Sequence, residues 1–436
     1  MPDFRLRLST PATIAADEAA TSFYWTPVAR STVIATLAPS SMHLGPNLGA
    51  LGDVPDRNID LVRIAVAVYC VDRSTNRSGG GSNWNRRPLN LTVPVLDVSV
   101  WRAAAPELKA VADLLTGDDW SFQFTAEETA AEDVVMSTST PTRVVLLSGG
   151  ADSAVGALLS RSQLGSDESH TLVSHFSSTL LAPLQRDVVS RIAGLIPGSS
   201  QEHVQAHLGR STKRLDGKDY RDEPTNRSRS LLFLAFGLAV ASVHKVPLWI
   251  PENGFASLNP PLGPERLGSL STRTTHPAFL TDLAALLGTV GAHNDIVNPF
   301  ANFTKGEMFT QAGELIGGAE AAQLLSATNS CAHTGQRSFK VSPSTPCGVC
   351  FGCVVRRASF VASGIDDLTA YINADGDPAL RGWLDGKSIE RSVERFVRKG
   401  VRTRDLIAMN LPSDYNVDAA VGLCQRGTAE LAGLFK

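Results

Sequence analysis

The sequence is poor in cysteine and has no long apolar run. Cysteine accounts for only 6 of the 436 residues, whereas disulfide-stabilised secreted domains are short and rich in it. The longest apolar runs, such as the one around Leu231–Val243, are shorter than the ~18 residues that a membrane span needs. The N-terminal residues contain no basic stretch followed by an apolar run, so we expect no secretory signal. Together these absences predict a cytoplasmic protein without a membrane partner.

An excess of charge of one sign is also missing. Lys and Arg number 40 and Asp and Glu number 43, so the formal net charge is -3, which argues against a broad nucleic-acid-binding face. Hydrophobic residues make up 43% and charged residues 19% of the chain, an ordinary globular composition that excludes wholesale disorder. At ~100–200 residues per domain, the length predicts two or three domains.

Three regions differ in their local patterns. Residues 1–140 mix short strands with one helix, which predicts an α+β accessory domain, and residues 366–436 predict a charged helical extension. The strands expected in the first region are Phe4–Leu8, Leu61–Cys70, Leu91–Leu96 and Trp120–Phe124, with a helix at Trp101–Leu115. The helices expected in the last region are Ser388–Lys399 and Arg404–Met409.

Residues 141–365 alternate between buried strands and helices. The expected strands are Val144–Leu147, Thr171–Phe176, Pro247–Ile250 and Asp295–Val297. The expected helices are Ala154–Ser162, Pro183–Leu195, Leu231–His244, Pro277–Val290 and Lys305–Ile316. Repeated βα alternation predicts an α/β fold with a parallel sheet covered on both faces. Because ligands bind at the carboxyl ends of such strands, the residues that follow each strand are the candidates for function.

A glycine-rich loop follows the first of these strands. It reads Ser148-Gly149-Gly150-Ala151-Asp152-Ser153 and leads into a helix. Adjacent glycines allow backbone N–H groups to converge on an anion, assisted by the positive end of the helix dipole. The two serines add hydroxyl donors, and Asp152 can cap the helix or hold Mg²⁺ against a polyphosphate. The alternative is an ordinary Gly-Gly turn with a helix cap, and the lack of a following lysine excludes a Walker A loop.

Four of the six cysteines cluster near the end of this middle region. Cys347, Cys350 and Cys353 have C-x2-C-x2-C spacing, and Cys331 lies 16 residues before the first of them. Four thiolates suit a closed, tetrahedral Zn²⁺ site of structural type. An iron–sulfur cluster uses the same ligands, and unmetallated core cysteines are the third interpretation. His333 is a spare donor, but a surface position is the simpler expectation for it.

The glycine loop resembles the PP-loop of the ATP pyrophosphatases, which cleave ATP between the α and β phosphates. With the four-cysteine site about 180 residues later, the chain resembles the 7-cyano-7-deazaguanine synthase (QueC-like) family over roughly residues 143–362. Further shared features are Arg229 before a long apolar helix, Lys305 at a helix start, the sequence Thr328-Asn329-Ser330-Cys331, and Arg356. Ser230 departs from the family's Arg-Asn pair, and the family's Tyr-Pro-Asp-Cys stretch is not evident. The additional terminal residues are similar to those of the QatC type of the Qat anti-phage systems.

The resemblance implies an adenine nucleotide alpha hydrolase-like core and a ligase that forms C–N bonds while releasing AMP and pyrophosphate. The implied cofactors are ATP, Mg²⁺ and Zn²⁺, with Cys331, Cys347, Cys350 and Cys353 as the metal ligands. The implied catalytic residues are Asp152, Ser153, Lys305 and Arg229. The residues implied in cofactor binding are Ser148, Gly149, Gly150, Asp152, Ser153, His175, Phe176, Glu252 and Asn253.

Several of these side chains also have a structural interpretation. Glu252 and Asn253 follow a strand. There Glu252 can hold Mg²⁺ and Asn253 can bind a base edge, and the alternative is that they form a turn with Asn-Gly chemistry. His175 and Phe176 end a strand at which related enzymes seat adenine, and a core position is equally consistent. Lys305 fits a phosphate contact, although a solvated lysine in the first turn of a capped helix is the alternative.

Cationic side chains gather around the long apolar helix. Arg227 and Arg229 flank its start, where positive charge is unfavourable unless an anion binds. They end a stretch, residues 207–229, with seven basic and four acidic residues, which we expect to be a solvated loop over the active site. Arg273 and His276 are weaker candidates, and a structural turn is the expectation for His276.

The leading hypothesis is ATP-dependent activation of the carboxylate of a 7-deazaguanine-like acid, followed by transfer to an amine, in anti-phage defence. The amine is left open between ammonia, a protein and a nucleic acid, and other proteins of the defence operon are expected partners. The alternatives are a housekeeping 7-cyano-7-deazaguanine synthase of queuosine biosynthesis, a different PP-loop enzyme, a non-catalytic ATP-binding scaffold and a zinc-stabilised interaction module. Release of AMP separates the enzymes from the scaffold, and ATP binding separates the scaffold from the module.

Overall fold

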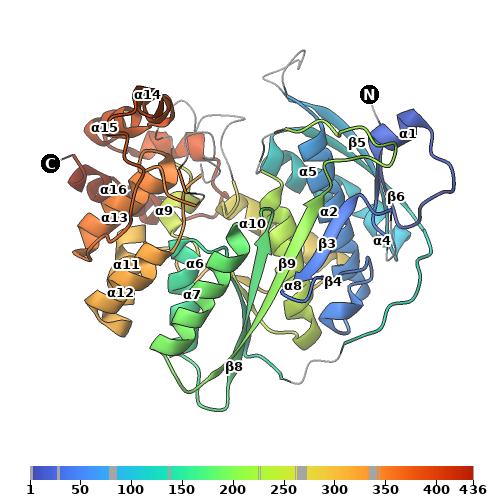
Figure 1. Ribbon diagram of the computed structural model, residues 1–436, viewed down its shortest axis with the longest axis horizontal. Coiled ribbons are helices and arrows are strands. Elements are labelled where there is room, and N and C mark those ends of the chain that lie inside the picture. The colour runs from blue at the N-terminus through green and yellow to red at the C-terminus, as the bar shows by residue number, and fades with distance from the viewer. Residues whose placement is uncertain are drawn as a thin grey trace.

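Two sheets organise the chain in the computed structural model, which describes residues 3–26, 30–77, 86–135, 139–223, 225, 227–260, 262, 273–332, 341–342 and 344–435. The strands are β1 (Asp3–Arg7), β2 (Ser22–Tyr24), β3 (Val33–Ala38), β4 (Met42–His43), β5 (Pro88–Pro94), β6 (Asp119–Thr125), β7 (Arg143–Leu146), β8 (Ser169–Phe176), β9 (Ser200–Arg210), β10 (Leu248–Trp249) and β11 (Ile296–Val297). The smaller sheet has the order β2-β1-β5-β6 and the larger the order β11-β10-β7-β8-β9-β3-β4 (Figure 1).

Helices surround both sheets. They are α1 (Ala16–Thr21), α2 (Asp56–Ser74), α4 (Val98–Ala103), α5 (Ala105–Thr116), α6 (Ala151–Ser162), α7 (Leu181–Leu195), α8 (Arg229–His244), α9 (Gly254–Ser257), α10 (Pro277–Val290), α11 (Lys305–Ile316), α12 (Gly318–Ala327), α13 (Phe351–Ser363), α14 (Pro378–Lys387), α15 (Glu390–Lys399) and α16 (Val417–Gly433), with 3₁₀ turns η1 (Gly49–Leu51) and η5 (Thr403–Met409). In the described part of the chain, no helix combines the length and the hydropathy that crossing a bilayer requires.

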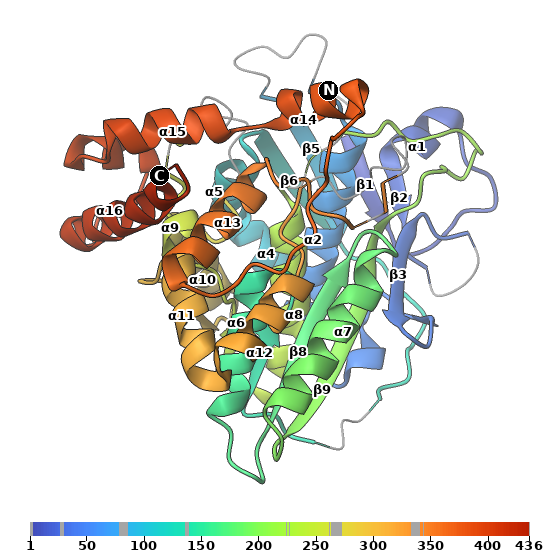
Figure 2. The same cartoon turned by 60° about the vertical axis from the view of Figure 1, so that its left-hand side comes forward.

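The larger sheet confirms the expected α/β core. Its strands β11, β10, β7, β8 and β9 are parallel, and side chains alternate along β7 as in any strand. Val144 and Leu146 pack into the core that contains α8 and α10, whereas Val145 and Leu147 pack into the core that contains α6, α7, α11 and α12. Helices therefore cover both faces of this sheet (Figure 2).

The N-terminal residues also extend the larger sheet. Strand β3 is antiparallel to β9, with Val33 opposite Arg210 and Ala38 opposite Gln205, and β4 pairs with β3. Strand β9 was not expected from the sequence, because its polar residues lack the β-branched run that identifies a strand. The division at residues 140 and 365 stays a prediction, and this pairing crosses the first of those positions.

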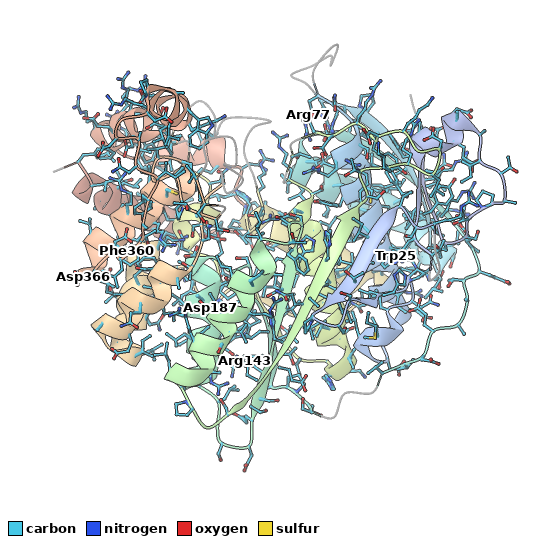
Figure 3. The ribbon with its side chains drawn as sticks, in the orientation of Figure 1. Trp25, Arg77, Arg143, Asp187, Phe360 and Asp366 are labelled. Carbon is cyan, nitrogen blue, oxygen red and sulfur yellow. The ribbon has the colours of Figure 1, made fainter. Side chains whose placement is uncertain are left out.

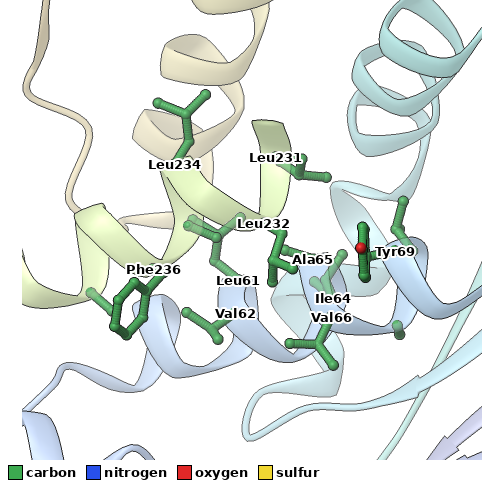
Figure 4. Close-up of a cluster of buried hydrophobic side chains, with 14 of the residues drawn as sticks. Leu61, Val62, Ile64, Ala65, Val66, Tyr69, Leu231, Leu232, Leu234 and Phe236 are labelled. Carbon is green, nitrogen blue, oxygen red and sulfur yellow. The ribbon is translucent and has the colours of Figure 1, made fainter. Parts of the chain in front are cut away.

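The expected strand Leu61–Cys70 is wrong, because this segment lies within α2. Its β-branched residues favour strands, but α2 is enclosed by the small sheet on one side and by α8 on the other. Nearly every residue of the helix is buried (Figure 4). A helix enclosed in this way has no exposed polar face, and its buried residues include Asp60, Arg63 and Asp72 as well as apolar side chains. The 3.6-residue pattern that marks most helices is therefore missing.

A buried ion cluster joins the end of α2 to the start of α8. Asp72 and Asp118 are fully buried, and both pair with the guanidinium of Arg87 and with that of Arg77 (3.1 and 2.7 Å from Arg77; Figure 3). The Asp72 carboxylate also accepts a hydrogen bond from the Ser228 hydroxyl (2.6 Å), and Ser228 is the residue that precedes α8. Burial alone would raise the pKa of Asp72, but the two guanidinium groups lower it, so the carboxylate is ionised. The N-terminal residues thus fix the start of α8.

Replacing Ser228 by Ala is expected to lower the free energy of unfolding by about 1.5–3 kcal/mol, the range for a hydrogen bond to a charged group. Chemical denaturation measures this loss. Ser242→Ala is the matched control, because Ser242 is a buried serine of the same helix that bonds only to a backbone carbonyl, that of Ala239. Equal losses in the two variants would contradict the assigned role of Asp72.

Candidate active site and metal centre

The glycine loop between β7 and α6 has the geometry of an anion site. Gly149 has φ +88°, and a Cβ there would lie 2.8 Å from a methyl group of Leu184, so this position requires glycine. The Ser148 and Ser153 hydroxyls lie 3.1 Å apart, and the Ser148 N–H donates to the Ser153 hydroxyl oxygen (3.2 Å). Two hydroxyl groups therefore meet at the N-terminus of the twelve-residue helix α6, an arrangement suited to a phosphate group.

Asp152 and Lys305 form a buried ion pair beside this loop. The Asp152 Oδ1 and Lys305 Nζ atoms are 2.8 Å apart, and the two side chains are only 8% and 9% exposed. Asn253 Nδ2 donates to the other oxygen of Asp152 (2.8 Å). Burial alone would raise the pKa of Asp152, but the ammonium group and the hydrogen bonds lower it. The carboxylate is therefore ionised and fixed next to the presumptive phosphate position.

The same amide nitrogen brings a second carboxylate to the pair. Asn253 Nδ2 also donates to Glu252 Oε1 (3.2 Å), so carboxylate oxygens of Asp152 and Glu252 lie close to one atom. Hard cations such as Mg²⁺ prefer such oxygen ligands, and these two residues fit that ion. Asn253 Oδ1 accepts from the Ala256 N–H (2.8 Å) and caps α9, so the structural interpretation of Asn253 also holds.

Lys305 begins α11, as the sequence predicts, and the capping box of Thr304 and Glu307 is present. Sequence analysis did not find Glu430, from the C-terminal helix α16. Its carboxylate accepts from the Thr304 hydroxyl and from the Gly306 N–H (3.1 Å for the latter), and burial raises its pKa. Because no local pattern connects Glu430 with a helix more than a hundred residues earlier, only the tertiary structure identifies this contact.

A cavity of about 220 Å³ adjoins the glycine loop. Its polar lining includes Ser148, Ser153, Arg229 and Glu252, all of them predicted site residues. The rest of the lining is Leu146, Ser230, Phe233, Leu234, Ile250, Pro251, Thr274 and Thr275. Sequence analysis did not predict Phe233 as a lining residue. It lies one helical turn after Arg229 on α8, so the i, i+4 spacing places both side chains on the same face of the helix and could have identified it. Apolar side chains combined with hydroxyl and charged groups are typical of a small-molecule site.

His175 and Phe176 lie behind this cavity and do not line it. The Nε2–H group of His175 donates to the Leu208 carbonyl oxygen (2.8 Å), and its ring contacts Phe233 at 6.2 Å between centroids. Phe176 stacks on His207 at 5.1 Å. Both are buried, so the structure places them in the core position that was the alternative for them.

The buried histidines predict a loss of stability in weak acid. Burial lowers the pKa of His175 to about 3 and those of His170, His203 and His276 to about 4. In the unfolded chain these groups titrate near ~6.5, so the unfolded state binds more protons as the pH falls below that value. Urea denaturation at pH 7.5 and pH 5 should therefore show lower stability at pH 5. The drop should be smaller in a His175→Gln variant, and an unchanged drop would contradict the pKa shift of His175.

The remaining predicted cations have structural partners. Arg227 Nη1 donates to the Thr116 carbonyl oxygen (2.6 Å), and Arg273 Nη1 donates to that of Leu114 (3.2 Å), so both are anchored to the end of α5. His276 caps α10 and contacts the Met409 carbonyl oxygen, which agrees with the expected turn. The expectation of a loop over residues 207–229 is wrong at its start, because residues 207–210 end strand β9.

The four predicted cysteines converge on one point. Their sulfur atoms all lie within 4.8 Å of one another, and the Cys347–Cys353 and Cys350–Cys331 sulfur pairs are both 3.9 Å apart. A tetrahedral Zn²⁺ with Zn–S bonds of ~2.3 Å has S–S edges of ~3.8 Å, so the four thiols fit a single zinc ion. A four-iron cluster binds each thiolate through a different iron and needs more widely spaced sulfurs. His333 lies outside the described residues.

The cysteine cluster is connected to the glycine loop through residues Thr328–Cys331. The Asn329 N–H donates to the Gly149 carbonyl oxygen (3.0 Å), and the Asn329 side chain accepts from the Cys331 N–H (2.8 Å). Gly352 allows the closest approach, since a Cβ there would lie 2.1 Å from the Ser330 carbonyl oxygen. The cysteine cluster is thus connected to one side of the glycine loop.

Fold and site together define an α/β protein with a PP-loop-type phosphate site and a four-cysteine centre. The chain is similar to proteins named 7-cyano-7-deazaguanine synthase. That of Cupriavidus pinatubonensis (strain JMP 134 / LMG 1197) is 29% identical over 246 residues, which cover 53% of this chain and 98% of the relative. That of Ralstonia pickettii (strain 12J) is 28% identical over 244 residues, covering 52% and 98%. No protein-family model matches the chain. The similarity supports the QueC-like resemblance for about half of the chain.

Proposed function

We propose that this protein is an ATP-dependent ligase that activates the carboxylate of a 7-deazaguanine-like acid and transfers the acyl group to an amine. The observation that carries the proposal is the buried pair of Asp152 and Lys305 beside the glycine loop, whose two serines line the cavity. Buried ion pairs cost desolvation free energy and add little stability, and perturbed charges of this kind cluster at functional sites, so the pair favours a site that acts on a charged ligand. The similarity to 7-cyano-7-deazaguanine synthases supports the substrate class.

In the proposed reaction a carboxylate oxygen of the acid attacks the α-phosphorus of ATP, and the bond from that phosphorus to the bridging oxygen breaks. The products are an acyl-adenylate and pyrophosphate, which the loop Ser148–Ser153 would hold. An amine then attacks the acyl carbon, AMP leaves, and the amine loses a proton. Lys305 and Arg229 neutralise the charge that develops at the phosphorus, where preorganised cations contribute most. Asp152 and Glu252 would hold Mg²⁺, which supplies further charge neutralisation.

We further propose the anti-phage role of the QatC type for the chain. The relatives match only about half of it, and the other half builds the small sheet, β3, β4 and the C-terminal helices. These elements support the core, as the pairing of β3 with β9 and the contact of Asp72 with Ser228 show, but they add surface beyond the length of the relatives. They are therefore the proposed place at which a protein or nucleic-acid amine, or a further defence protein, is presented to the adenylate.

The proposal is tested with purified protein, Mg·ATP and 7-carboxy-7-deazaguanine. We expect AMP and pyrophosphate in equal amounts, released only when the acid is present. Addition of ammonia or a candidate amine should then increase turnover. ATP binding without AMP release, in protein that retains its metal, would identify a nucleotide-binding scaffold and would refute the ligase.

A further inference from the structure

A second cavity lies at the carboxyl ends of β8 and β9, where the last turns of α2 close it. It has a volume of about 110 Å³ and is lined by Tyr69, Arg73, Ser177, Leu208, Gly209, His207 and Arg210. Its wall is mostly polar, and it combines residues of the N-terminal region with the end of the central sheet. No function proposed above uses these side chains.

Two guanidinium groups give this cavity a positive charge. Arg73 and Arg210 both pair with one oxygen of Asp222, at 2.5 and 3.0 Å. Asp222 therefore neutralises only one of the two positive charges. The Arg210 side chain is only 6% exposed, whereas that of Asp222 is 61% exposed, so solvent screens the acid much more than the buried cation.

The buried arginine is also incompletely satisfied. Among the described residues, Arg210 Nε has no hydrogen-bond acceptor and no contact with solvent. A buried donor that is left unpaired destabilises the folded state. Its guanidinium otherwise bonds to the Ser211 and Arg221 carbonyl oxygens. The excess positive charge of the two guanidinium groups that line the cavity favours an additional anion beside Arg210.

Aromatic contacts connect the second cavity to the cavity of about 220 Å³ beside the glycine loop, which we call the nucleotide cavity. His207, from the lining of the second cavity, stacks on Phe176, and the preceding residue His175 contacts Phe233 of the nucleotide cavity. Arg229 lines the nucleotide cavity, and its charge also acts on Tyr69 of the second one. These aromatic contacts link the linings of the two cavities, which favours assigning an anion bound here to a second reactant.

We propose that this second cavity binds an oxyanion, a carboxylate or a phosphate, carried by the reactant that is not ATP. Two guanidinium groups and a serine hydroxyl form the usual donor set for such a group. The identity of that reactant, acid or amine, rests on the proposed function, but the oxyanion site itself does not. Ser177 is exposed at the cavity mouth, which makes it the residue to change without disturbing buried Arg210.

The test is calorimetric titration of inorganic phosphate into the full-length protein, with the nucleotide cavity first saturated by α,β-methylene-ATP. We expect saturable binding by the parent. Ser177→Asp, which places a competing carboxylate in the cavity, and Arg73→Gln should each weaken it at least tenfold. Ser177→Asn is the isosteric control. Arg191→Gln removes an exposed arginine of α7 that pairs only with Asp187 (Figure 3), and it should leave binding unchanged.

Absence of saturable phosphate binding by the parent, or parental affinity in Ser177→Asp, would overturn the proposal. Competition between phosphate and 7-carboxy-7-deazaguanine would support the site and identify the acid as the source of the oxyanion. Binding of phosphate without such competition would support it equally and assign it to the amine-bearing reactant. Because AMP release is not measured here, a failure of the proposed ligase reaction remains distinguishable from a failure of this site.

Discussion

Replacement of Asp152 by Asn is expected to lower acid-dependent AMP release on the order of 10²–10³-fold, the loss typical of removing one preorganised polar group from a reacting centre. The substitution keeps the shape of the side chain and removes its charge. Lys305 then loses the carboxylate that fixes its ammonium group 2.8 Å away, and Mg²⁺ loses one of its two proposed ligands. The measurement is the initial rate of AMP formation with saturating acid.

The same variant also tests the energetics of the buried pair. Removing one partner leaves Lys305 buried and uncompensated, which costs about 3–5 kcal/mol. The double variant Asp152→Asn with Lys305→Met removes the unpaired charge, so it should regain stability but no activity. Ser153→Ala should abolish turnover and cost less stability than Asp152→Asn, since its hydroxyl bonds only to uncharged groups among the described residues. Parental AMP release by Asp152→Asn would place the chemistry elsewhere in the molecule.

The site residues that follow a strand or begin a helix could be predicted because their signal is local. The glycine loop, Lys305 with its capping box and the C-x2-C-x2-C sequence each occupy a few consecutive residues, and the structure brings the first two together. The cysteine spacing predicted convergence correctly, because a metal imposes short distances whatever the surrounding fold. Local sequence also identified the βα alternation of the larger sheet.

The contacts between segments far apart in the chain could not be predicted, because no local sequence pattern marks them. Helix α2 is buried on nearly every side because two layers enclose it, and β9 is a strand because β8 and β3 pair with it on both sides. Asp72 and Glu430 support the first turns of α8 and α11 from opposite ends of the chain. Their roles depend on tertiary packing, which overrides local propensity. Nothing in the residues around them distinguishes them from surface acids.

Cys350→Ser is expected to cause a large loss of stability, because it removes one of the four thiols of the cysteine cluster. Structural zinc sites in small domains contribute about 10–16 kcal/mol of apparent binding free energy at pH 7. If this chain loses a third of that, the unfolding midpoint falls by about 10 °C, at ~2–4 °C per kcal/mol. Thermal unfolding of metal-loaded parent and variant, with zinc content measured in both, gives the result directly.

The matched control is Cys424→Ser, because Cys424 is buried in α16 but has no thiol neighbour in the described cysteine cluster. It should lose far less stability and keep its zinc. The hydrogen bond from Asn329 to Gly149 predicts a second effect of Cys350→Ser. If the cysteine cluster becomes disordered, the glycine loop loses one of the contacts that hold it in place. The variant should therefore bind ATP more weakly even below its unfolding temperature. A heat-stable Cys350→Ser protein with parental ATP affinity would show that the four thiols hold no structural metal.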